Sequence, residues 1–270
     1  MTQTATGPTR SVATGPDRLR AAAVLLTAVA QLVIGSIGGS GAFGEPIGVV
    51  SAAYETPIVP TSGAFVIWGP IYLGVLVLAV RQALPSQWAR PEHRATGWWL
   101  VAAACANAGW IALFSSRLVG WAEVAIVALL VCLAVVMSRL APRDGVPAPT
   151  ADRWTLHGPV ALYAGWVSVA TVVGTAATGR WAGLPGGGAV AVTLAVVMLV
   201  VTGGIAAAVV RVGPAPVVYA AAVLWALGGV VVAGPPPAVA IAATVAAVLV
   251  LAAVALRLRR APAPLAAAFG

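Results

Sequence analysis

The sequence contains no lysine, and acidic residues, histidine and cysteine are scarce. Its 15 basic residues are all arginine, against 7 acidic residues and two histidines. The two cysteines, Cys105 and Cys132, lie in apolar stretches and belong to no CxxC pair or Cys/His cluster. The sequence therefore indicates neither a disulfide framework nor a metal centre, and each thiol is expected to pack as a small apolar group.

A soluble domain is excluded by the same shortage of charge. Charged residues make up 8% of the chain, whereas a soluble globular domain carries about 25%. Hydrophobic residues make up 61%, and the mean hydropathy is +0.99. No polar stretch between the apolar runs is long enough to form a domain of its own.

Eight apolar stretches are each close to the roughly 20 residues that a helix needs to cross a bilayer. Several are separated by proline- and glycine-rich breaks, such as the Gly-Pro-Pro-Pro run at 234–237. We therefore predict an all-α, polytopic transmembrane helical bundle of eight spans, with a disordered N-terminal tail at 1–20 and a C-terminal tail at 261–270. The first span could instead be a cleaved signal peptide, but we expect it to be retained. The predicted spans are 21–38, 60–80, 97–114, 121–137, 159–177, 189–210, 216–232 and 238–256.

The arginines indicate how the spans are oriented. If the N-terminus is cytoplasmic, thirteen arginines fall in cytoplasmic segments, and only Arg117 and Arg180 fall in outer loops. This bias predicts a multi-pass protein of the plasma membrane with both termini cytoplasmic. The net charge of +8 does not indicate nucleic-acid binding, because no soluble element carries a basic face. The lipid bilayer is the expected partner, and a homodimer stays open.

Three of the spans carry side chains that could form a ligand site. Each has an aromatic residue three or four positions from a second aromatic or polar residue, so that the two share a helix face. Flat aromatic walls with a few polar groups suit a flat ligand. Packing of the bundle is the commoner reason for such spacing. The pairs are Trp68 and Tyr72, Asn107 and Trp110, and Tyr163 and Trp166; Pro70, inside the first pair, predicts a kink.

At these residues the chain resembles the TspO/MBR family of tryptophan-rich sensory and translocator proteins. The resemblance covers about residues 21–182, and its segments occur in the order of the second, third and fifth helices of that family. They are Phe65-Val-Ile-Trp68-Gly-Pro70-Ile-Tyr72-Leu-Gly74, Asn107-Ala-Gly-Trp110-Ile-Ala-Leu-Phe114 and Leu162-Tyr163-Ala-Gly-Trp166-Val-Ser168-Val-Ala170.

The chain also departs from the family pattern. The family has five helices, so residues 183–260 form an additional three-helix segment beyond a core at 21–182. Leu162 stands where the family has proline, and Val172-Val173-Gly174-Thr175 replaces an expected Leu-Asn pair. No tyrosine directly precedes Arg180, so a sterol-recognition motif is not supported there.

The resemblance implies an integral membrane protein that binds a tetrapyrrole such as protoporphyrin or haem, for sensing, transport or breakdown. No resident cofactor is required. Trp68 and Trp166 would contact the ring and be capable of redox chemistry, and Tyr72, Asn107, Trp110 and Tyr163 would complete the site.

Two other functions stay open. A transporter or permease of a small apolar molecule fits eight spans, but the span interiors lack the ionisable residues that couple transport to ions. An enzyme is not indicated, because no nucleophile–base pair or nucleotide loop is present. His93 in a loop and His157 near a span end are expected to be interfacial. Light-dependent porphyrin degradation is the one catalytic activity that the tryptophans would suit.

Overall fold

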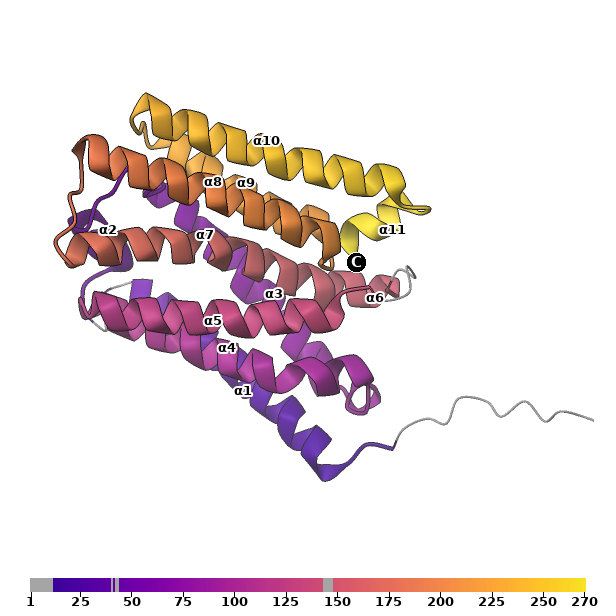
Figure 1. Ribbon diagram of the computed structural model, residues 1–270. Helices are drawn as coiled ribbons and strands as arrows, with labels where there is room; N and C mark the ends of the chain where they lie inside the picture. Colours follow the sequence, from indigo (N-terminus) through magenta and orange to yellow (C-terminus); the bar gives the residue numbers. More distant parts are fainter. Residues whose placement is uncertain (1–11, 40, 42–43, 143–147) are drawn as a thin grey trace, which may run out of the picture.

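A computed structural model describes residues 12–39, 41, 44–142 and 148–270. Within these ranges the chain is helical and contains no strand. The longer helices are α1 (Gly15–Gly39), α3 (Trp68–Ala83), α4 (Pro91–Ser115), α5 (Val119–Leu140), α7 (Gly158–Trp181), α8 (Gly188–Val212), α9 (Pro216–Val232) and α10 (Pro237–Arg260). Most of the longer helices run side by side, and α1 and α3 are inclined to the others (Figure 1). Short elements are α2 (Ile47–Ala53), η1 (Ser62–Ile67), η2 (Pro85–Gln87), α6 (Thr150–Asp152), η3 (Arg153–His157) and α11 (Pro264–Phe269).

Within the described residues, seven helical segments are long and apolar enough to cross a membrane, which confirms the polytopic helical class. The eighth predicted span, α9, is equally apolar but has 17 residues. At 1.5 Å per residue it is about 25 Å long, at the lower limit for a bilayer core of about 30 Å. It is a well-buried helix, with Tyr219, Val223 and Leu227 in the core.

Helix α7 lies at the centre of the bundle. It packs against α3 and α5 on one side and against α8 and α9 on the other (Figure 1). Gly165 permits the approach to α9, because a Cβ atom there would lie 2.5 Å from the Tyr219 carbonyl oxygen. Buried residues of all eight long helices form one continuous hydrophobic cluster. The three C-terminal helices are therefore packed into the same core as the first five.

The arginines gather at one end of the bundle, as the predicted orientation requires. We call it the arginine-rich end; it holds the start of α1, the α3–α4 connection, α6 with η3, and the last turns of α8 and α10. Asp152 pairs with Arg81 at 2.5 Å and with Arg90 at 2.6 Å, and Arg94 pairs with Asp17 at 2.6 Å. The opposite, arginine-poor end holds α2, the α4–α5 and α7–α8 connections and the α9–α10 turn.

The described parts of both predicted tails contain helix. The predicted tail at 1–20 includes residues 1–11, which lie outside the described residues, but Gly15–Arg20 is helical. Asp17 accepts hydrogen bonds from the Thr14 backbone N–H at 3.0 Å and from the Thr14 hydroxyl at 2.8 Å, and its charge suits a helix start. In the predicted tail at 261–270, Pro264–Phe269 forms α11, where Phe269 stacks on Trp154 at 5.0 Å.

Candidate functional site

Trp68 lies at the centre of a cluster of aromatic rings from three helices. Its indole stacks on Tyr72 at 5.3 Å and on Trp110 at 5.8 Å between ring centroids. It meets Tyr163 and Trp166 edge-on, at 6.0 and 6.1 Å. The structure therefore brings together all five aromatic residues that the sequence singled out, on α3, α4 and α7.

The backbone around Trp68 differs from the predicted kinked helix. Ser62–Ile67 forms a 3₁₀ segment, and the α-helix starts at Trp68. Pro70 consequently lies in the first turn of α3, where a missing backbone N–H breaks no helical hydrogen bond. The change of helix type therefore falls before Trp68, whereas the sequence predicted an irregularity at Pro70.

The 3₁₀ segment adds Phe65, which sequence reasoning did not include among the site residues. Residues three apart in a 3₁₀ helix lie on the same side, so Phe65 follows Trp68 onto α7 and meets Trp166 edge-on at 5.8 Å. Phe114 was missed as well; it stacks on Trp110 at 5.7 Å. Its position four residues after Trp110 was the available signal. Both extend the cluster towards the arginine-poor end.

Two amides hold the tyrosines of the cluster. Asn107, fully buried, donates from Nδ2 to the Tyr72 hydroxyl at 3.3 Å, and Gln31 of α1 donates from Nε2 to the Tyr163 hydroxyl at 3.3 Å. Gln31 was not among the predicted site residues, and its position as a polar residue inside a predicted span was the available signal. Gly35 of α1 makes room for Tyr72, because a Cβ atom there would lie 2.4 Å from the tyrosine ring.

Three buried polar atoms of the cluster have unused hydrogen-bonding capacity. Among the described residues, Asn107 Oδ1, Gln31 Oε1 and Trp166 Nε1 have no hydrogen-bond partner. Buried polar groups are seldom left unpaired in a folded protein. The cluster thus offers two acceptors and one donor in an otherwise apolar setting, which a ligand or water could satisfy.

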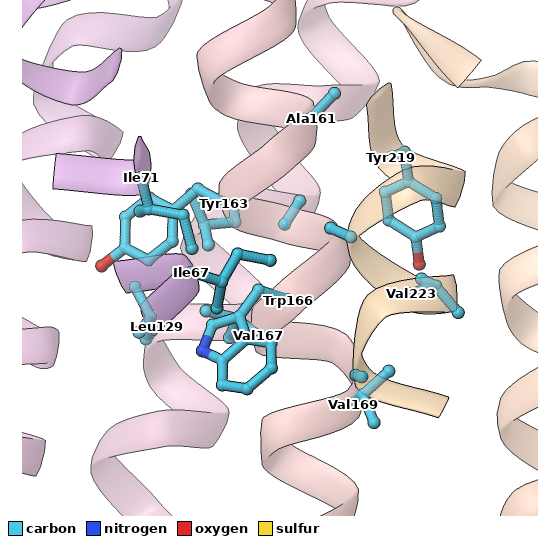
Figure 2. Close-up of a cluster of buried hydrophobic side chains, with 14 of the residues drawn as sticks. Ile67, Ile71, Leu129, Ala161, Tyr163, Trp166, Val167, Val169, Tyr219 and Val223 are labelled. Carbon is cyan, nitrogen blue, oxygen red and sulfur yellow. The ribbon is translucent and has the colours of Figure 1, made fainter. Parts of the chain in front are cut away.

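Figure 2 shows that Tyr163 and Trp166 lie on the side of α7 that faces Ile67 and Ile71, whereas Tyr219 lies across α7, on α9. The aromatic cluster is therefore confined to the interface of the first five helices. The C-terminal helices nevertheless reach its edge, because Trp225 of α9 donates its indole N–H to the Ala64 carbonyl oxygen at 2.8 Å.

A cavity of about 40 Å³ adjoins the cluster. A site for a drug-sized ligand is typically about 300–1,000 Å³. The predicted ligand-site residues therefore form packed rings beside a small void and do not enclose a ligand-sized cavity. Tyr72, Asn107 and Tyr163 do not line the void. Its aromatic lining is Phe65, Trp68, Trp110, Phe114 and Trp166, joined by Ile47 and Ser51 of α2, Pro60, residues of α7 and Ala226 of α9.

The two histidines lie away from this cluster, at the arginine-rich end. His93 was expected in a loop, but α4 begins at Pro91 and buries it to 1% exposure. His157 ends η3 and is 7% exposed. The expected loop position is therefore wrong for His93, because α4 starts earlier than the apolar run, and both imidazoles are buried within the protein.

These features define a polytopic helical membrane protein with an intramembrane aromatic cluster. A family model described as TSPO-like protein matches residues 21–256, and the chain belongs to this family. The match confirms the expected family and also runs through α8, α9 and α10, beyond residues 21–182. No curated protein and no solved structure matches the chain.

Proposed function

We propose that the protein binds a flat hydrophobic ligand of the porphyrin or haem class at the aromatic cluster, within the plasma membrane and with both termini cytoplasmic. The observation that carries this proposal is the position of Trp68. Its ring contacts four others, while the buried indole N–H of Trp166 beside it has no partner among the described residues. Stacked rings and one free donor match a flat ligand with polar edges.

Binding requires the cluster to open, because the adjoining cavity of about 40 Å³ cannot hold a macrocycle. Among the elements that line the cavity, α2 is expected to move most easily. It has 7 residues, and its Ile47 and Ser51 line the cavity. A helix this short has little stability of its own. Movement of α2 together with the Phe65 ring therefore makes room at lower cost than separation of α3, α4 and α7.

We propose that the ligand is cargo or signal and that no resident cofactor is required. Trp68 and Trp166 would contact the macrocycle directly and could exchange electrons with a photoexcited porphyrin. Light-dependent breakdown is the one catalytic step that this arrangement would favour.

The test is equilibrium binding of protoporphyrin to detergent-solubilised protein, followed by the porphyrin absorbance band. We expect saturable binding that is lost in the Trp68→Leu/Trp166→Leu variant. A matched control removes two tryptophans that are 50% and 67% exposed, Trp98→Leu/Trp121→Leu, and should bind as the unmodified chain does. Equal affinity in all three proteins would refute the proposal.

Passage of the ligand across the membrane is the second candidate. It is favoured by a larger cavity at the arginine-poor end that shares Ser51, Pro60 and Phe65 with the aromatic cavity. Flux of porphyrin into vesicles containing the protein distinguishes a carrier from a sensor, since a sensor binds the ligand without accelerating its uptake.

A further inference from the structure

The larger cavity lies at the arginine-poor end, and we call it the vestibule. Its volume is about 730 Å³, within the usual range of about 300–1,000 Å³ for a small-molecule site. Three parts of the chain that are distant in sequence form its walls. They are the segment from Gly48 to Phe65, the α7–α8 connection with Arg180 and Gly186–Gly188, and the α9–α10 turn at 233–236.

The vestibule adjoins the aromatic cluster. Ser51, Pro60 and Phe65 line both the vestibule and the smaller aromatic cavity. Phe65 thus forms part of the wall of each cavity, and its ring meets that of Trp166 with 5.8 Å between the ring centroids. A ligand standing in the vestibule would therefore meet Phe65 first, and behind it the unpartnered indole N–H of Trp166, which is 2% exposed.

The charge in the vestibule wall favours an anion. Arg180 forms no ion pair within the described part of the chain, and its contact with the Leu184 carbonyl oxygen is 3.4 Å long. Helices α8 and α10 start at the wall, and their caps, Gly187 and Pro236, supply no side-chain hydrogen bond. The positive ends of both helix dipoles are thus directed at this region. Glu55, which also lines the vestibule, is the opposing charge; it is exposed and has no ion pair in the part of the chain that the structure describes.

We propose that the vestibule is an anion-binding subsite that holds the carboxylates of an amphiphilic ligand against Arg180 while its flat apolar part enters the aromatic cluster past Phe65. This inference rests on the proposed function and deepens it, since it assigns the ligand a carboxylate-bearing edge. It also gives α8, α9 and α10 a role, because their connections complete the subsite.

The test compares protoporphyrin, which carries two propionates, with its dimethyl ester, which carries none. Three variants are measured with both: Arg180→Gln, Glu55→Gln and Arg117→Gln. Arg117 is the matched control, because it lies at the same end but outside the vestibule, bound to Glu45 by two hydrogen bonds of 2.6 and 2.7 Å. All three side chains are exposed, so the fold is expected to persist.

We expect the unmodified chain to bind the acid about three- to tenfold more tightly than the ester. This range corresponds to the free energy of a solvent-exposed, charge-assisted contact between a carboxylate and arginine. Arg180→Gln should remove this preference, Glu55→Gln should increase it, and Arg117→Gln should leave it unchanged. Equal binding of acid and ester, unaffected by Arg180→Gln, would overturn the subsite and leave the proposed function standing. Failure of both compounds to bind the unmodified chain would overturn both.

Discussion

Trp68 of α3 stacks on Trp110 of α4, with ring centroids 5.8 Å apart and planes inclined by 28°. This contact joins two helices that share α1 as a packing partner but otherwise pack on different helices, α4 on α5 and α3 on α7. Because the same indole also touches α7 through Tyr163 and Trp166, the pair fixes how three helices meet. The aromatic cluster is therefore both a structural junction and a candidate ligand site.

A double-mutant cycle should reveal that junction. Trp68→Leu and Trp110→Leu are expected to couple by about 0.5–1.5 kcal/mol in the free energy of unfolding in detergent, the usual worth of an aromatic pair beyond its buried area. The control cycle pairs Trp68→Leu with Trp98→Leu, whose indole is 50% exposed. Additive effects in the first cycle would mean that the two rings are neighbours without a specific interaction.

Gly35→Ala should destabilise the protein by about 1–3 kcal/mol, because the added methyl group overlaps the Tyr72 ring and must displace it. The displaced tyrosine would also lose its hydrogen bond from Asn107. Gly228→Ala is the matched control in α9, where a Cβ atom meets nothing within 4 Å. Thermal unfolding should show a loss for the first variant and no loss for the second.

Asp152→Asn should lower the free energy of unfolding by about 3–5 kcal/mol, the usual penalty for breaking a buried ion pair. Asp152 is 2% exposed and holds both Arg81 and Arg90, linking α3 and the α3–α4 connection to the start of α7. The pKa of Arg90 is raised, chiefly by its hydrogen bond to Asp152. Glu92→Gln serves as the control, since its contact with Arg90 is exposed and 3.3 Å long. Equal free energies of chemical unfolding for Asp152→Asn and Glu92→Gln would contradict the prediction that Asp152→Asn is the less stable variant.

Acid should weaken the ion pair between Glu45 and Arg117 at the arginine-poor end. The hydrogen bonds from Arg117 hold the pKa of the Glu45 carboxyl below its usual value. A lowered pKa stabilises the folded state above the unfolded-state pKa of about 4.3, and this contribution disappears as the pH falls through the folded-state pKa. The difference in Tm between the unmodified chain and Glu45→Gln should therefore shrink between pH 7 and pH 3. A constant difference would show that the pair does not titrate with folding.

The sequence predicted the long helices and five members of the aromatic cluster, but not Phe65 or Phe114. Apolar runs locate the long helices, and spacings of three or four residues place Trp68 with Tyr72 and Tyr163 with Trp166 on common faces whatever the tertiary packing. The arginine distribution likewise predicts that one end of the bundle is basic, as the pairs around Asp17 and Asp152 show.

Other features depend on contacts that spacing does not contain. The 3₁₀ segment before Trp68 turns Phe65 onto Trp166, and helical spacing alone gives no sign of it. Gln31 meets Tyr163 across 132 positions of sequence. The small size of the aromatic cavity depends on how the rings fill the space between helices, and the vestibule depends on which connections meet at one end.

The most direct test of the account is the crystal structure of the chain bound to protoporphyrin. We predict that the macrocycle lies against Trp68 and Trp166, with Phe65 and α2 displaced and the propionates towards Arg180. A macrocycle bound on the outer surface of the helices, with the rings of the aromatic cluster still packed as they are here, would contradict the central claim.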